Sequence, residues 1–149
     1  MLRSVYWLLV PGLFAALLGL PVAAGAKERV DDHTVRVTSI IGDVDDRDVI
    51  VLDDEIARGT TLIEILAKLR EHRVSSVRVA CTHGLFADGA LDKIAAAPEV
   101  SEIVCTNTVP PPDAGDSGKL TVLSVAPALA EAIRRIHVGE SVSALFGQH

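Results

Sequence analysis

The sequence has few aromatic residues and no excess of positive charge, and both shortages narrow the possible functions. Aromatic side chains make up 3% of the 149 residues, so Val, Ile, Leu and Ala must supply the core, as is typical of a parallel sheet covered by helices. The net charge of −6 argues against non-specific binding to nucleic acid, which needs a basic surface. A phosphate-bearing ligand is still compatible with an acidic protein, because backbone N–H groups can bind phosphate locally.

Cysteine is also scarce, and its positions exclude several kinds of site. Cys81 and Cys105 are isolated from each other in the sequence, and each follows a run that contains valine. Two such thiols do not make a disulfide framework, and no CxxC motif or Cys/His cluster indicates a metal site. We expect both thiols to be buried near strand ends. The chain also lacks GxxxxGK[ST], which excludes a P-loop.

The first 26 residues allow two interpretations. Arg3, the apolar run that follows it and the small residues of "AGA" are together typical of a secretory signal. The run is interrupted by Pro11, so we expect no stable membrane span. Alternatively, residues 13–19 are the end of a helix that stops at Gly19, and residues 20–26 form a short buried strand.

Farther along, strand-like and helix-like patterns alternate. This βαβ alternation predicts one α/β domain with right-handed crossover connections, a mostly parallel sheet and helices on both faces. We expect Thr60 or Thr61 to cap the first helix of this region, with Glu64 completing a capping box, and Gly139 to end the last helix. The expected strands are 35–41, 49–52, 74–82, 101–108 and 120–125, and the expected helices are 60–73, 89–98 and 126–139.

The candidate site lies in residues 49–62, which read "VIVLDDEIARGTTL". Asp53 and Asp54 end the most hydrophobic strand, and in open α/β sheets ligands bind at such carboxyl ends, near a helix N-terminus. Two carboxylates can accept hydrogen bonds from a vicinal diol such as that of ribose, and the following loop can bind a phosphate. The simpler alternative is that the two aspartates only end a strand and help to cap a helix.

These residues resemble the motif that binds phosphoribosyl pyrophosphate (PRPP), in which a strand leads into paired aspartates and a Thr-Gly-Gly-Thr-like loop. The chain is similar, over residues 13–146, to the C-terminal half of ribose-phosphate pyrophosphokinase, the PRPP synthetase. The similarity also covers "THGLFADGALDKI", "IVCTNTVPPP" and "KLTVLSVAPALAEAIRRIHVGESVSALF". It implies a type I phosphoribosyltransferase-like domain at residues 13–149, preceded by an atypical segment at residues 1–12.

The resemblance also implies roles for individual residues. Lys27 and Arg29 match a flexible catalytic loop that neutralises phosphate charge, and Asp53 and Asp54 match the pair that contacts ribose. His83 follows a strand end, where it either approaches the ligand or makes a local loop hydrogen bond. The loop that binds the 5-phosphate corresponds to Ala57, Arg58, Gly59, Thr60 and Thr61.

Three positions of this loop depart from the family pattern. Ala57 replaces an aspartate, Arg58 replaces a threonine and Thr60 replaces a second glycine. The Arg58 guanidinium could pair with phosphate. Thr60 would be strained if the backbone there needs a positive φ.

The resemblance implies a reaction that converts ribose-5-phosphate and ATP into PRPP and AMP and that uses Mg²⁺. It also implies a cytoplasmic protein that forms a homo-oligomer or associates with full-length synthetase subunits. No metal-ligand group is expected in the chain itself. The alternatives are a non-catalytic module that binds ribose phosphate or PRPP, a phosphoribosyltransferase that consumes PRPP, and a secreted binding protein.

Overall fold

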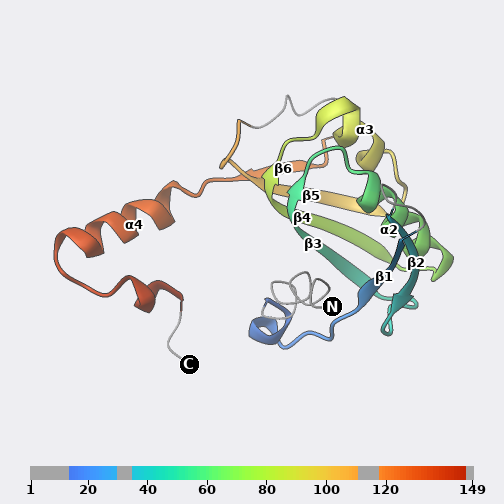
Figure 1. Cartoon of the computed structure of the whole chain (residues 1–149), viewed down its shortest axis with the longest axis horizontal. Coiled ribbons are helices and arrows are strands. Elements are labelled where there is room, and N and C mark those ends of the chain that lie inside the picture. Colours follow the sequence, from blue (N-terminus) through green and yellow to red (C-terminus); the bar gives the residue numbers. More distant parts are fainter. Residues whose placement is uncertain (1–13, 30–34, 111–117, 147–149) are drawn as a thin grey trace.

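The computed structural model describes residues 14–29, 35–110 and 118–146, and it confirms the α/β class (Figure 1). A four-stranded parallel sheet has the order β3-β4-β5-β6, and β1 and β2 form a separate antiparallel pair. The strands are β1 (Ala24–Arg29), β2 (Val35–Ile41), β3 (Asp48–Ile56), β4 (Ser76–Gly84), β5 (Val100–Thr106) and β6 (Leu120–Leu123). The helices are α2 (Thr60–Glu71), α3 (Ala90–Ala95) and α4 (Ala126–His137), with short 3-10 turns η1 (Ala87–Gly89) and η2 (Val142–Phe146).

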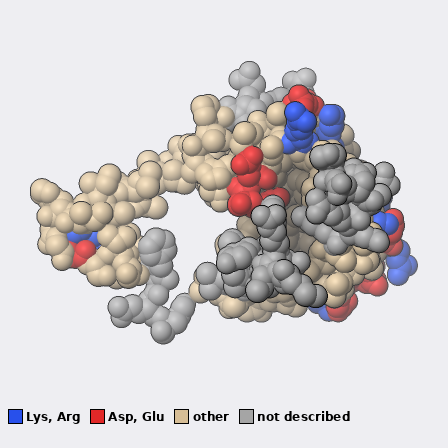
Figure 2. Space-filling model, in the orientation of Figure 1, with Lys and Arg blue, Asp and Glu red and all other residues tan. Residues whose placement is uncertain are grey.

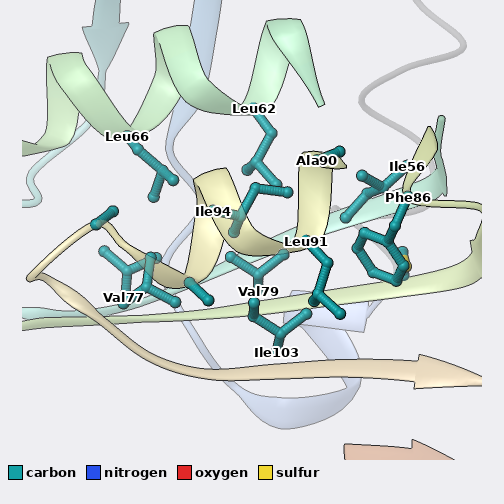
Figure 3. Close-up of a cluster of buried hydrophobic side chains, with 14 of the residues drawn as sticks. Ile56, Leu62, Leu66, Val77, Val79, Phe86, Ala90, Leu91, Ile94 and Ile103 are labelled. Carbon is teal, nitrogen blue, oxygen red and sulfur yellow. The ribbon is translucent and has the colours of Figure 1, made fainter. Parts of the chain in front are cut away.

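The core lies between the parallel sheet and the helices α2 and α3. Figure 3 shows Leu62 and Leu66 of α2 and Ile94 of α3 pointing toward the side chains of the sheet. Ile94 and Ile103 are fully buried, at 0% exposure. Because α2 and α3 share one cluster of apolar side chains, both crossover helices lie on the same face of the sheet.

The start of α2 differs from the prediction. Its N-cap is Gly59, and no side chain caps the helix, so the expected capping box of Thr61 and Glu64 is wrong. Glu64 instead accepts a hydrogen bond of 3.0 Å from the backbone N–H of Val37. This bond links α2 to the β1–β2 pair. The Glu64 carboxylate therefore makes a tertiary contact instead of the capping interaction that the sequence spacing predicts.

The segment before β1 agrees only in part with the second interpretation of the N-terminus. Residues 14–18 are helical and Gly19 follows with φ 64, as expected of a helix stop. The strand begins at Ala24 rather than at residue 20, and Leu20 and Val22 are exposed rather than buried. Residues 1–13, which hold the atypical segment and the start of the signal-like run, lie outside the described residues.

Helix α4 lies apart from the sheet, at the end of an extended connection from β6 (Figure 1). It packs against η2, and its apolar residues Leu129, Ile133 and Ile136 are 59–68% exposed. Gly139, with φ 73, follows the helix end as predicted. In the part of the chain that the structure describes, no helix has the length and apolar character needed to cross a membrane.

Candidate functional site

Asp53 and Asp54 lie near the carboxyl end of β3, but they do not end the strand. The strand continues to Ile56, with Asp53 in register with Cys81 and Glu55 in register with His83. Successive strand residues point to opposite faces, so Asp53 lies on the side of the helices and Asp54 on the other side. A single ligand that contacts both carboxylates must therefore lie across the end of the strand.

The acidic residues here hydrogen-bond to their own backbone. The Asp54 N–H donates to Asp53 Oδ1 at 2.9 Å, and the Glu55 N–H donates to Asp54 Oδ1 at 3.0 Å. Asp54 and Glu55 are exposed, and a carboxylate has two oxygens, so the Asp54 side chain keeps acceptor capacity. In Figure 2 acidic side chains gather on the sheet body where the left-hand end of β3 lies in Figure 1.

The loop between β3 and α2 depends on one glycine. Gly59 has φ 68, and a Cβ added there would lie 3.2 Å from Ile94 Cδ1 and 3.3 Å from Ala90 Cβ. Glycine is therefore needed both for the left-handed backbone and for close contact with α3. The strain considered for Thr60 does not arise, because the left-handed residue is Gly59 and Thr60 is the first residue of the helix.

The loop after β4 braces the loop after β3. The Ile56 carbonyl oxygen accepts hydrogen bonds from the N–H groups of Leu85 (3.1 Å) and Phe86 (3.0 Å), and the Ala57 carbonyl accepts from Ala87 (2.8 Å). These bonds hold the backbone of the candidate phosphate loop before any ligand arrives.

Arg58 forms an ion pair of 3.3 Å with Asp88, which follows β4. Both side chains are largely exposed, so this pair contributes little to stability and the guanidinium can turn to another anion. A phosphate at the N-terminus of α2 would compete with Asp88 for Arg58.

His83 belongs to a hydrogen-bonded group at the ends of β4 and β5. Its Nδ1 lies 2.8 Å from the Thr108 hydroxyl. The hydroxyls of Thr106 and Thr108 lie 2.7 and 3.0 Å from the carbonyl oxygen of Thr82. His83 thus makes a hydrogen bond, but its partner lies 25 positions along the chain rather than in the same loop, and the bond directs Nδ1 toward the end of β5.

Both cysteines are free and buried, as predicted. Burial raises the pKa of the Cys81 thiol to about 12, with smaller contributions from Cys105 and Asp53. Burial also raises the pKa of Cys105. Neutral, enclosed thiols are poor nucleophiles, so neither cysteine is a catalytic candidate.

Lys27 and Arg29 lie in strand β1, which differs from the flexible loop that we expected for them. In the antiparallel register Lys27 pairs with Val37 and Arg29 with Val35. Their side chains lie outside the described part of the structure, as does the segment 30–34 that follows them.

Sequence reasoning overlooked three polar residues near the site. Asp88 partners Arg58, and Thr106 and Thr108 surround His83. The rule that selected Asp53, polar side chains after an apolar strand, also applies to residues 106–108 and could have found the two threonines. Asp88 carried no such signal, because its place beside Arg58 follows from the packing of two loops.

The described residues contain no group of three or more His, Cys, Asp or Glu side chains that could together hold a metal ion. The carboxylates of β3 therefore do not form a magnesium site from protein ligands alone. Magnesium is often held by one or two carboxylates together with substrate phosphates, which needs the substrate as well.

Comparison with known proteins gives consistent matches. Residues 26–147 match the model of the phosphoribosyl synthetase-associated domain. A Streptomyces coelicolor protein named "Putative ribose-phosphate pyrophosphokinase" is 62% identical over 133 residues, covering 89% of this chain and 42% of the relative. The ribose-phosphate pyrophosphokinase of Deinococcus radiodurans is 45% identical over 123 residues, covering 80% of this chain and 38% of the relative.

A solved structure supports the same relationship. The crystal structure of phosphoribosylpyrophosphate synthetase from Mycobacterium smegmatis matches with a TM-score of 0.76 and 34% identity, covering 89% of this chain and 42% of that one. The chain spans about two-fifths of the length of these relatives. The resemblance to the PRPP synthetase is thus confirmed, and the chain belongs to the phosphoribosyl synthetase-associated domain family.

Proposed function

We propose that this chain binds ribose-5-phosphate or PRPP at the carboxyl end of β3, as the ribose-phosphate half of a ribose-phosphate pyrophosphokinase. One observation supports the proposal most directly. Asp53 and Asp54 are followed within a few residues by the left-handed Gly59 and by the N-terminus of α2, which no side chain caps. A sugar phosphate has a diol and an anion, and these residues offer carboxylates to the diol and helix N–H groups to the anion.

The ribose part of the ligand would lie across the end of β3. Asp53 and Asp54 lie on opposite sides of the strand, so each carboxylate would accept a hydrogen bond from one of the two hydroxyls of the diol. The backbone bonds of Asp54 and Glu55 to the preceding carboxylates orient these side chains in advance.

The phosphate would lie at the N-terminus of α2. The first N–H groups of a helix have no partner within the helix, and the dipole of this 12-residue helix favours an anion there. The exposed hydroxyls of Thr60 and Thr61 and the guanidinium of Arg58 add donors on the same loop. Ala57 to Thr61 would thus bind the 5-phosphate mainly through backbone groups.

We propose that catalysis belongs to an assembly that includes full-length synthetase subunits, or a homo-oligomer, in the cytoplasm. In that reaction the ribose 1-hydroxyl attacks the β-phosphorus of ATP, a new O–P bond forms, and AMP leaves as the bond between the α- and β-phosphates breaks. Lys27 and Arg29 would offset the charge on the phosphates. The described residues alone form no group of three or more side chains that could hold Mg²⁺.

Isothermal titration calorimetry with ribose-5-phosphate tests the binding proposal. Asp53→Asn and Asp54→Asn should each weaken binding by about tenfold or more, because each removes a charge-assisted hydrogen bond. Glu71→Gln is the matched control, since it makes the same change at the far end of α2, about 18 Å from the loop. Equal affinity for all four proteins, or no binding to the unaltered chain, would contradict the proposal.

A second experiment separates catalysis from binding alone. PRPP formation from ATP and ribose-5-phosphate is measured with the purified chain, with a full-length synthetase such as the Deinococcus radiodurans relative, and with both together. The proposal expects the chain to bind ribose-5-phosphate. Turnover by the purified chain alone would indicate a catalytic homo-oligomer, and a change of turnover only in the mixture would indicate an assembly with full-length subunits. Binding without any effect in the mixture would identify a non-catalytic module, and consumption of PRPP with a nucleobase would identify a phosphoribosyltransferase.

A further inference from the structure

The turn that follows β4 has an unusual backbone. Phe86 (φ 48) and Asp88 (φ 56) are left-handed although neither is a glycine, and Gly89 (φ 70) is left-handed as well. This conformation is uncommon for any residue with a side chain, and it is most unfavourable for a bulky one such as phenylalanine. Strained backbone of this kind persists only where the surrounding structure holds it in place. Contacts of residues 86–89 must therefore supply that support.

On its inner side the turn is held by a buried ring. The Phe86 side chain is 6% exposed and belongs to the hydrophobic core. Gly84 leaves room for this ring, since a Cβ added at Gly84 would overlap it. The ring fixes the first residue of the turn, whereas Asp88 is exposed to solvent. The left-handed backbone at Asp88 therefore needs a second support.

Lys93 supplies this second support from α3. Its Nζ donates a hydrogen bond of 2.8 Å to the carbonyl oxygen of Asp88, five residues earlier in the chain. A bond from an ammonium group is charge-assisted and is stronger than a bond between two neutral groups. Helix α3 is itself fixed, because Ile94, the residue after Lys93, is fully buried. Lys93 thus ties the exposed half of the turn to a helix that the core holds in place.

The turn passes this support on to the candidate phosphate loop. The N–H groups of Leu85 and Phe86 donate to the carbonyl oxygen of Ile56, the last residue of β3. The N–H group of Ala87 donates to the carbonyl oxygen of Ala57, where the loop begins. The position of the turn therefore sets the direction in which the chain leaves β3.

Helix α3 also meets the phosphate loop directly. A Cβ added at Gly59 would lie 3.2 Å from Ile94 Cδ1, so the loop rests against the helix on the side of the core. On the solvent side, the Asp88 carboxylate pairs with Arg58 at 3.3 Å. The loop is thus connected to α3 twice, once through the core and once at the surface by way of Asp88 and Lys93.

We propose that Lys93 is a positioning residue for the candidate phosphate loop, Ala57 to Thr61. By holding the Asp88 carbonyl, Lys93 keeps the left-handed turn in place, and the N–H groups of the turn fix the carbonyls of residues 56 and 57. Lys93 acts through the turn rather than on a ligand. The consequence for ligand binding rests on the proposed function, whereas the effect on the backbone does not, so the two are tested apart.

Amide hydrogen exchange of the unliganded protein tests the effect on the backbone. Lys93→Met keeps the apolar stem and removes the ammonium group, so exchange of residues 84–89 should become roughly three- to tenfold faster. Lys93→Arg keeps a charged donor and should restore slow exchange. Lys68→Met is the matched control, because it makes the same change on α2, where Lys68 pairs with Glu71. Exchange of β5 should stay the same in all variants, which separates a local effect from global destabilisation.

Calorimetry with ribose-5-phosphate on the same variants tests the consequence for binding. Lys93→Met should weaken binding about threefold or more, and Lys93→Arg should restore most of the affinity. The proposal is overturned if exchange of residues 84–89 is unchanged in Lys93→Met, or if faster exchange leaves the affinity unaltered. Weaker binding with unchanged exchange would overturn it as well, because Lys93 would then act on the ligand by its charge. If the unaltered chain does not bind ribose-5-phosphate, the proposed function fails, and exchange of the turn alone decides the role of Lys93.

Discussion

Asp53 of β3 and Cys81 of β4 lie side by side on neighbouring parallel strands, so a carboxylate of the candidate site borders a buried thiol. Burial, Cys105 and then Asp53 raise the pKa of the Cys81 thiol from 9.0 to about 12. The Cys81 thiol beside Asp53 therefore stays neutral at physiological pH. Any chemistry at the candidate site depends on oxygen and nitrogen groups rather than on a thiolate.

Cys81 should resist alkylation in the folded protein. Its raised pKa lowers the thiolate fraction at pH 8 by a factor of roughly a thousand relative to an ordinary cysteine, and burial slows access further. Iodoacetamide followed by peptide mass spectrometry should find Cys81 unmodified under native conditions and modified in urea. Rapid modification of the native protein would contradict both the burial and the pKa.

The same thiol predicts a decline of stability at high pH. The folded-state pKa lies above the unfolded value, so the contribution of Cys81 is fully present below pH 9 and is lost as the pH rises toward 12. Urea denaturation at a series of pH values should show the free energy of unfolding falling less steeply for Cys81→Ala than for the unaltered chain. Parallel curves would show that Cys81 does not carry this dependence.

Gly59→Ala should destabilise the protein more than Gly89→Ala. Both glycines are left-handed, with φ 68 and 70, and each substitution should cost about 1–2 kcal/mol of backbone strain. Only Gly59 has neighbours, since its added Cβ would meet Ile94 and Ala90, whereas nothing lies within 4 Å at Gly89. The difference between the two free energies of unfolding therefore measures the close contact between the loop and α3. Equal values would show that this contact relaxes.

Core and α4 positions should respond very differently to truncation. Ile94→Ala removes a fully buried side chain and should cost about 2–5 kcal/mol of unfolding free energy. Ile133→Ala should change it by less than about 0.5 kcal/mol, because Ile133 is 67% exposed. Thermal or urea denaturation checks both. A large cost at Ile133 would mean that α4 packs on the sheet body in solution.

The ion pair of Arg58 and Asp88 should tune ligand affinity rather than stability. Asp88→Asn frees the guanidinium and should tighten ribose-5-phosphate binding severalfold, whereas Arg58→Gln should weaken it. Because both partners are exposed, either change should alter the unfolding free energy by less than about 1 kcal/mol. Calorimetry at low and high salt checks the affinity, and an Asp88→Asn variant with weaker binding would exclude the competition.

Much of the fold could be predicted from local patterns. The alternation of "VRVTSII" and the helical spacing of Leu62, Leu66 and Leu69 are periodic, and periodicity depends on residues close together in the chain. The family resemblance rests on the same kind of local order, since it follows from consecutive residues such as "VIVLDDEIARGTTL". Element type, element order and the location of the candidate loop were therefore accessible before any coordinates.

Two predictions were wrong, the capping box of α2 and the loop at Lys27 and Arg29, and both involve residues far apart in the sequence. Glu64 fits a capping box by spacing, but the backbone N–H of Val37 takes its carboxylate. Lys27 and Arg29 lie in a strand rather than a loop, because β2 offers their backbone a partner. Neither outcome has a local signature.

The order of an apolar strand, paired aspartates, a glycine and an amphipathic helix follows from the sequence alone, because apolar spacing and residue type are properties of neighbouring positions. Three features instead depend on tertiary packing: Gly59, rather than Thr60, has the left-handed backbone, Arg58 meets Asp88, and β3 borders no other described strand on one side. These features depend on how loops and strands far apart in the chain pack, and packing is set by three-dimensional contacts that no local pattern encodes.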